Sequence, residues 1–140
     1  MSEWTECPLD ELVEISSGGT PARANPIFWG GNIPWITPSD ITACKTNYIF
    51  DASDTITDKG LASSSAKLLP EGTLLLTSRA TIGEIKIAAR PMTTNQGFKN
   101  LVARPVADAM FLFYQLSRLK GHFERYAAGS NFLEINRTDF

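Results

Sequence analysis

Seven polar side chains in the middle of this sequence are of the types that hydrogen-bond to nucleic acid. Arg and Lys can bond guanine or phosphate, and Asn or Gln can bond adenine. All seven fall in or next to segments predicted as strands and turns, and loops on a rigid sheet are good carriers of recognition residues. They are Lys45, Asn47, Lys67, Arg79, Arg90, Gln96 and Lys99. Because a polar loop residue is simply solvated in most proteins, the set is a candidate interface only.

The charges are unevenly distributed along the chain, whose formal net charge is −2. Residues 1–53 carry two Lys or Arg against seven Asp or Glu, whereas residues 54–104 carry seven against four, a local net charge of +3. Attraction to phosphate depends on nearby cations more than on the total charge. The middle segment therefore permits a DNA-binding face, although an ordinary mixed surface explains the charge pattern equally simply.

No arrangement of residues in the sequence predicts a catalytic site. The pairs Gly18-Gly19 and Gly30-Gly31 lie among prolines, and no Gly-Lys-Ser/Thr follows them, so they are not phosphate-binding loops. The single histidine, His122, lies in a predicted helix and is expected to be a surface or packing residue. Asp51 and Asp54 could hold a metal ion, but turn and capping roles are commoner. We expect neither metal nor cofactor in this chain.

The length of 140 residues fits one domain with a modest core. No apolar run approaches the roughly 20 residues that a membrane span needs. The N-terminus is acidic and lacks the apolar core of a signal peptide. Cys7 and Cys44 have no metal-ligand spacing and are expected to be free thiols. These features predict a cytoplasmic protein without a membrane partner.

Strands are the main elements expected to position the candidate side chains. They are predicted near 33–36, 47–50, 73–78, 84–88 and 99–103. The third and fourth are expected to form a β-hairpin. Residues 9–15 fit either a helical turn or a strand.

Loops and one short helix fill the rest of the first hundred residues. The Gly- and Pro-rich residues 16–26 are predicted to be a loop. Residues 28–40 are expected to form an ordered loop that Trp29 and Trp35 pin in place. Thr57 is the predicted N-cap of a short helix over 58–65.

The longest predicted element is a helix over about 107–126. An apolar stripe runs along it at helical spacing and includes Leu112, Leu116, Leu119 and Phe123. The stripe is either core of this domain or a seam for a partner helix. The fold class predicted from these elements is α+β. It comprises a small, mostly antiparallel, strongly looped sheet, a short helix and one long C-terminal amphipathic helix.

Short motifs, taken in order, resemble the target-recognition domain of type I restriction–modification specificity subunits. The match covers nearly the whole chain, and the order of the motifs makes it more specific than any single tetrapeptide. The motifs are 18–21 (GGTP), 29–31 (WGG), 33–35 (IPW), Asp40, 57–61 (TDKGL), 69–73 (LPEGT), 79–83 (RATIG), 94–98 (TNQGF), 129–132 (GSNF) and 134–135 (EI).

The resemblance implies a non-catalytic subunit that reads double-stranded DNA. Each recognition domain of the family reads one half of a split target. Methyltransferase subunits bind S-adenosylmethionine and methylate adenine, and a restriction subunit translocates and cuts DNA using ATP; S-adenosylmethionine, ATP and Mg²⁺ are thus expected in partner subunits. One recognition domain over residues 1–140, without the spacer helix, is expected here. An excised piece, a truncated gene and a half-subunit that forms a homodimer all stay open.

The resemblance also ranks the candidate residues. Because specificity must differ between relatives, the shared motifs are expected to build the scaffold rather than to read bases. The better candidates for base contact lie outside the motifs and are Lys45, Asn47, Lys67, Arg90 and Lys99.

Other roles stay open for the polar residues inside the motifs. Asn95 and Gln96 are expected to bond backbone in a turn, and Arg79 to contact either a phosphate or Asp40. An alternative function is a helix-mediated assembly fragment that does not bind DNA by itself.

Overall fold

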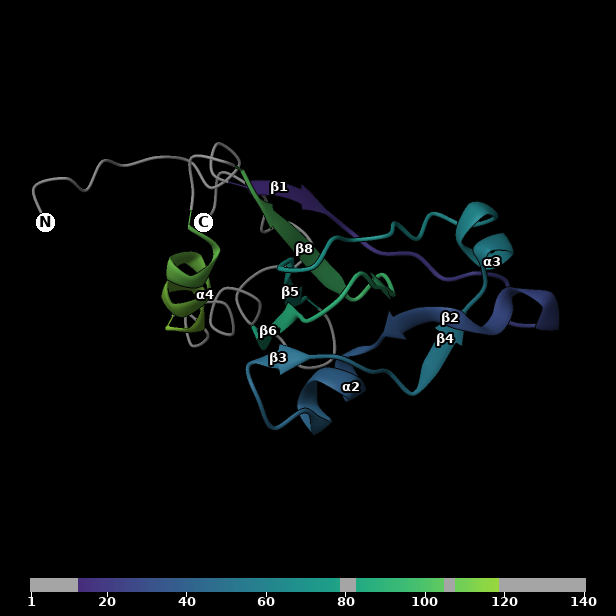
Figure 1. The fold of residues 1–140 in the computed structure, drawn as a ribbon, viewed down its shortest axis with the longest axis horizontal. Helices are drawn as coiled ribbons and strands as arrows, with labels where there is room; N and C mark the ends of the chain where they lie inside the picture. Colours follow the sequence, from purple (N-terminus) through teal and green to yellow (C-terminus); the bar gives the residue numbers. More distant parts are fainter. Residues whose placement is uncertain (1–12, 79–82, 105–107, 119–140) are drawn as a thin grey trace, which may run out of the picture.

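A computed structural model describes residues 13–78, 83–104 and 108–118 of the chain (Figure 1). The described elements form two β-sheets with short helices around them. In chain order they are β1 (Val13–Ser16), the 3-10 helix η1 (Pro26–Phe28), β2 (Trp29–Ile36), α2 (Pro38–Ala43), β3 (Tyr48–Ile49), β4 (Asp54–Ile56), α3 (Asp58–Ala62), β5 (Leu74–Thr77), β6 (Ile85–Ala88), β7 (Thr93–Thr94), β8 (Phe98–Ala103) and α4 (Ala109–Ser117).

The larger sheet has five strands in the order β1-β8-β5-β6-β3. Strands β5 and β6 form the predicted hairpin, with Leu74 opposite Ile87 in an antiparallel register. The run of apolar residues in β5 is explained by its central position: Leu74 and Leu76 pack into one hydrophobic cluster and Leu75 into another. Both faces of this sheet are therefore covered, as a continuous apolar run predicts.

Helix α4 covers one face of the five-stranded sheet, as Figure 1 shows at its left. The side chains of Leu112, Phe113 and Leu116 pack in one buried cluster with Leu74 and Leu76. Asp108 caps the helix, because its carboxylate accepts hydrogen bonds from the backbone N–H groups of residues 110 and 111. The cap starts α4 two residues later than predicted, and residues 119–140, which include Leu119 and Phe123, lie outside the described residues.

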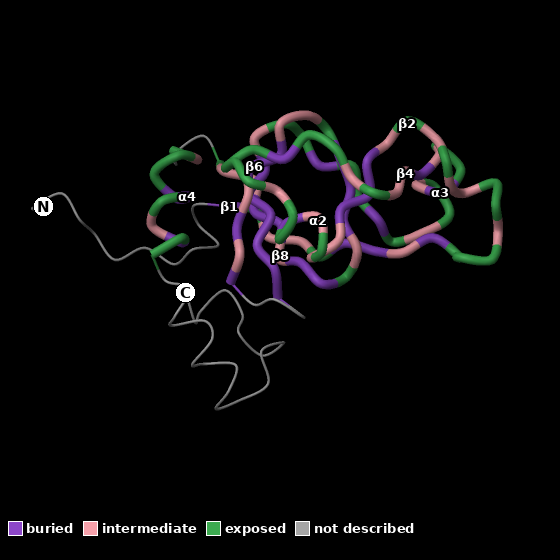
Figure 2. The backbone as a smooth tube through the Cα atoms, turned by 90° about the horizontal axis from the view of Figure 1, so that it is seen from below, coloured by how far each residue is buried: buried purple, intermediate pink, exposed green. Residues whose placement is uncertain are grey.

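The opposite face of the same sheet is covered by α2 and by the end of β2. Ile41 of α2 and Ile36 of β2 are buried with Leu75, Met92 and Phe98. Figure 2 shows buried backbone concentrated along these central strands. The edge strand β3 is held to this core by Ile49, which leaves its neighbours in the chain exposed.

The smaller sheet has three strands in the order β4-β2-β7. Trp29 and Trp35 of β2 contact each other edge to face, with ring centroids 5.0 Å apart. Trp35 is buried with Ile56 of β4, and Leu61 of α3 packs against them. The predicted N-cap of α3 is confirmed, since Thr57 Oγ1 accepts a hydrogen bond from Gly60 N at 3.0 Å.

The α+β class is confirmed, but details differ from the prediction. There are two sheets rather than one, because β4 and β7 are too short to recognise and form only by pairing with β2. Four strand pairs among the described residues are antiparallel and two are parallel. Residues 13–16 form a strand. Most of the predicted loop 28–40 is strand β2, which pairs with β4 and β7, and its end is helical, since Thr37 and Asp40 make a capping box before α2.

Candidate nucleic-acid interface

Two of the candidate residues lie together beside β3, at an edge of the five-stranded sheet. Residues 44–51, which we call the edge segment, run from the end of α2 through β3, and Lys45 and Asn47 lie in its exposed first half. Neither side chain makes a hydrogen bond or ion pair to another described residue. Their amide and ammonium groups are thus available to an outside partner.

Arg90 lies against the same edge segment but is engaged within the domain. Its Nε donates a hydrogen bond to the Phe50 carbonyl oxygen at 2.9 Å, and its Nη2 pairs with Asp51 at 3.0 Å. The guanidinium also lies over the Phe50 ring, 4.6 Å from the centroid. The structure therefore groups Arg90 with Lys45 and Asn47 and gives it three contacts that hold the edge segment.

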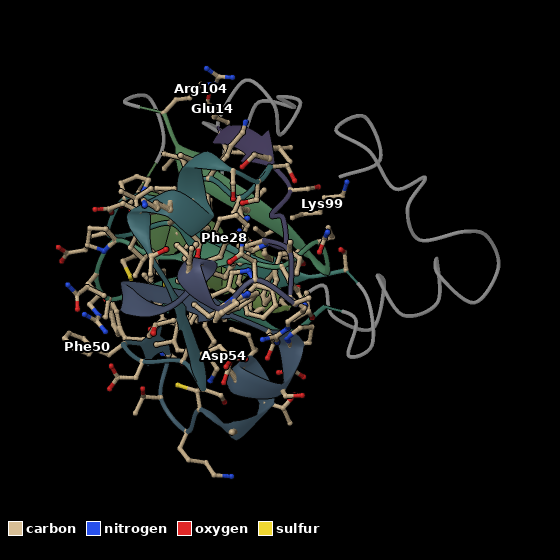
Figure 3. The ribbon with its side chains drawn as sticks, turned by 90° about the vertical axis from the view of Figure 1, so that its right-hand side faces the viewer. Glu14, Phe28, Phe50, Asp54, Lys99 and Arg104 are labelled. Carbon is tan, nitrogen blue, oxygen red and sulfur yellow. The ribbon has the colours of Figure 1, made fainter. Side chains whose placement is uncertain are left out.

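Gln96, Lys67 and Lys99 lie away from the edge segment. Gln96 is exposed in the turn between β7 and β8, where its Oε1 accepts a short hydrogen bond from the Thr20 hydroxyl. Lys99 is on β8, and Figure 3 places it on the opposite side of the domain from Phe50. Lys67 is exposed and follows Ala66, whose backbone nitrogen lies close to Gly19. The six candidates that lie within the described residues therefore do not form one patch.

The two turn residues, Asn95 and Gln96, bond different kinds of partner. Asn95 Oδ1 accepts a hydrogen bond from Gly97 N at 2.8 Å, which is the predicted bond to backbone in a turn. Gln96 bonds a side chain instead. Arg79 lies outside the described residues, so neither role predicted for it can be placed.

Among the described motif residues, 18–19, 35 and 94–95 contact one another as parts of the scaffold. Gly19 N donates to the Thr94 carbonyl oxygen at 3.0 Å, and Trp35 Nε1 donates to the Gly19 carbonyl oxygen at 2.9 Å. A Cβ atom on Gly18 would lie 2.2 Å from the backbone oxygens of Thr94 and Asn95, so only glycine fits there. These contacts join the loop after β1 to β2 and β7 of the three-stranded sheet.

The acidic residues considered as metal ligands are engaged with arginines. Asp51 pairs with Arg90, and Asp54 pairs with Arg23 at 3.1 Å. Within residues 13–78, 83–104 and 108–118, no group of three or more His, Cys, Asp or Glu could hold a metal ion. In the same residues, no helix has the length and apolar character needed to cross a membrane.

The described half of the stripe on α4 faces the sheet. Leu112 and Leu116 are 6% and 4% exposed, so both positions fit the core interpretation of the stripe. The opposite side of α4 exposes Met110 and Tyr114, and the Tyr48 hydroxyl donates to the Met110 sulfur at 3.5 Å.

Two basic residues that make structural contacts are not among the seven candidates. Lys86 Nζ donates to the Thr46 carbonyl oxygen at 2.6 Å, which ties β6 to the edge segment. Arg23 stacks on Trp29, with its Cζ 4.1 Å from the ring centroid. Lys86 and Thr46 lie 40 residues apart in the chain, so no local pattern signals their contact.

Known specificity subunits are similar to this chain over most of its length. A family model described as the type I restriction modification DNA specificity domain matches residues 1–140. The type I restriction enzyme MjaIX specificity subunit of Methanocaldococcus jannaschii is 35% identical over 135 residues, which cover 95% of this chain and 31% of that protein. The EcoprrI specificity subunit of Escherichia coli is 29% identical over 143 residues, covering 99% and 34%. The chain thus spans about a third of the length of these relatives.

Solved structures share the fold. The HsdS subunit from Thermoanaerobacter tengcongensis superposes with a TM-score of 0.61 at 22% identity, covering 83% of this chain and 27% of that one. The S subunit of a type I restriction–modification system from M. genitalium gives a TM-score of 0.62 at 14% identity, covering 91% and 29%.

Proposed function

This chain belongs to the family of type I restriction modification DNA specificity domains, and from that premise we propose that it reads a DNA sequence. It acts as one target-recognition domain of a specificity subunit and reads one half of a split target. The observation that carries the proposal is the family match over residues 1–140, in which motif residues form the scaffold while less patterned polar residues stay exposed.

Several exposed or half-buried polar side chains support DNA contact. Lys45, Lys67 and Lys99 make no ion pair with a described residue, so their ammonium groups are available to phosphates or guanine. Asn47 and Gln96 present amide groups at exposed positions, which suit adenine. Arg79 belongs to the same proposal.

The chemistry of the complex belongs to other subunits in this proposal. Asp51 and Asp54, the acidic pair that a nuclease site would need, each form an ion pair with an arginine. The domain therefore directs partners to the DNA: a methyltransferase that uses S-adenosylmethionine to modify adenine, and a restriction subunit that uses ATP and Mg²⁺.

Selection from a randomised duplex library tests the proposal. The 140-residue chain is incubated with the library at moderate salt, and bound duplexes are recovered and sequenced through successive rounds. We expect one short sequence to be enriched, because base-edge contacts discriminate by about 1–3 kcal/mol for each good bidentate pair. Recovery of the library without enrichment, or no recovery at low salt, would exclude sequence reading by this chain.

A further inference from the structure

The edge segment is an exposed stretch beside the large sheet. Residues 45–48, 50 and 51 are exposed, whereas Ile49 is buried in the core below them. In Figure 1 the chain between α2 and β3 runs along the lower edge of the domain. An exposed segment at the edge of a sheet can present its side chains to base edges, from which DNA sequence is read.

The first half of the edge segment is fixed by β6 and by its own side chains. Lys86 Nζ bonds the Thr46 carbonyl oxygen at 2.6 Å, and Ile87 N bonds the Asn47 carbonyl oxygen at 2.8 Å. The Thr46 hydroxyl donates to the Tyr48 carbonyl oxygen at 2.7 Å. The backbone of this turn is therefore held, while the side chains of Lys45 and Asn47 point to no described partner.

The second half is fixed by Arg90. Its guanidinium bonds the Phe50 carbonyl oxygen and the Asp51 carboxylate, and it covers the Phe50 ring. Ala89 N also donates to the Ile49 carbonyl oxygen at 2.8 Å. An arginine that makes two directed hydrogen bonds and one stacking contact holds one geometry, which a lysine cannot reproduce.

We infer that the edge segment is a sequence-reading element of this domain, with Asn47 contacting a base and Lys45 a phosphate. Lys86 and Arg90 are positioning residues, which hold the segment rather than touch DNA. Recognition gains affinity when the binding loop is already ordered in the free protein, because less entropy is lost on binding. This inference rests on the proposed function and adds the residues that carry it.

The test uses the 140-residue chain, the duplex recovered by selection and all single-base-pair variants of that duplex. Asn47→Ala is expected to lose about fivefold to 150-fold of discrimination at one base-pair position, the range of one bidentate amide–adenine contact. Lys45→Ala is expected to lower the slope of log K against log salt by about 0.9 and to leave discrimination unchanged.

The positioning role is tested with Arg90→Lys and Lys86→Met. Arg90→Lys keeps the charge, so the salt slope should stay that of the parent while discrimination at the Asn47 position falls. Lys86→Met in the Asn47→Ala background should cause no further loss of discrimination, because both changes act through one contact. Lys59→Met on α3, an exposed lysine near the smaller sheet, is the matched control and should leave discrimination unchanged. Denaturant unfolding confirms that each variant is folded.

Two results would overturn parts of this inference separately. Parent-like discrimination in both Asn47→Ala and Lys45→Ala, with an unchanged salt slope, would remove the edge segment from the interface but leave the proposed function standing. A lower salt slope with unchanged discrimination in Arg90→Lys would make Arg90 a phosphate contact. If the parent chain binds no duplex, the proposed function fails and this inference fails with it.

Discussion

Asn100 on β8 donates a hydrogen bond from its Nδ2 to the Thr94 hydroxyl on β7, at 2.9 Å. Both side chains are buried, and the contact joins the five-stranded sheet to the three-stranded sheet. The Asn100 Oδ1 atom has no hydrogen-bond partner among the described residues. The amide is therefore only partly satisfied, and its one contact should matter to the stability of the junction.

Thr94→Val keeps the shape of the side chain and removes the acceptor for Asn100. We expect the free energy of unfolding to fall by about 1–3 kcal/mol, because a buried amide donor is left unpaired. Urea unfolding followed by tryptophan fluorescence measures the change. Thr55→Val on β4, where the half-buried hydroxyl makes no hydrogen bond to another described residue, should cost much less. Equal losses in the two variants would show that the contact does not stabilise the junction.

Gly18→Ala should be strongly destabilising, because the added methyl would overlap the backbone oxygens of residues 94 and 95. Overpacking of this kind costs typically about 1–3 kcal/mol and occasionally more. Gly30→Ala is the comparison, since its Cβ meets nothing within 4 Å but its φ is +84°. We expect Gly30→Ala to lose roughly 1 kcal/mol from backbone strain alone. Thermal and urea unfolding of the two variants measure this order, and a reversed order would contradict the close packing of the glycine loop.

Leu116→Ala distinguishes the two interpretations of the apolar stripe on α4, which is either core of this domain or a seam for a partner helix. Leu116 is buried against the sheet, so the substitution should lower the free energy of unfolding by about 2–5 kcal/mol. Tyr114→Ala, on the exposed side of the same helix, should have a much smaller effect. Urea unfolding and gel filtration are measured together. If Leu116→Ala leaves the stability unchanged and dissociates an oligomer, the stripe is a seam for a partner helix.

Asp40→Ala should destabilise α2 and the chain that follows it. The Asp40 carboxylate accepts hydrogen bonds from Thr37 N at 2.9 Å and from Ser53 N at 3.1 Å, so it joins the helix start to the segment before β4. Loss of a capping side chain costs about 0.5–2 kcal/mol, and the bond to Ser53 should place this variant at the upper end. Asp58→Ala in the first turn of α3 is the control with no such cross-link. A smaller unfolding effect for Asp40→Ala than for Asp58→Ala would contradict the role of this carboxylate.

Local signals predicted the elements that depend on neighbouring residues. The Thr57 cap and the β5–β6 hairpin are fixed by short-range patterns, and both are present. The start of α2 was readable in the same way, from Thr37 and Asp40 three residues apart, but the Gly and Pro content of residues 28–40 favoured a loop.

Contacts between distant residues could not be predicted. The role of Arg90 depends on Phe50 lying beside it, and that follows only from the parallel pairing of β3 with β6. The β7 strand has two residues, Thr93 and Thr94, and becomes a strand only because β2 lies next to it. Candidate residues could therefore be chosen by type and by position outside the motifs, but the proposed division into contacting and positioning residues rests on the fold.

Sequence reading is tested most directly by the ratio of two dissociation constants, for the duplex recovered by selection and for single-base-pair variants of it, each measured at two salt concentrations. A change at a position that the domain reads should weaken binding by about 1–3 kcal/mol, which raises Kd roughly fivefold to 150-fold. Both constants should rise with salt while their ratio stays constant, because phosphate contacts carry the salt dependence and base contacts carry the discrimination. Equal Kd values for the recovered duplex and all its variants at both salt concentrations would contradict a DNA-reading function for this chain.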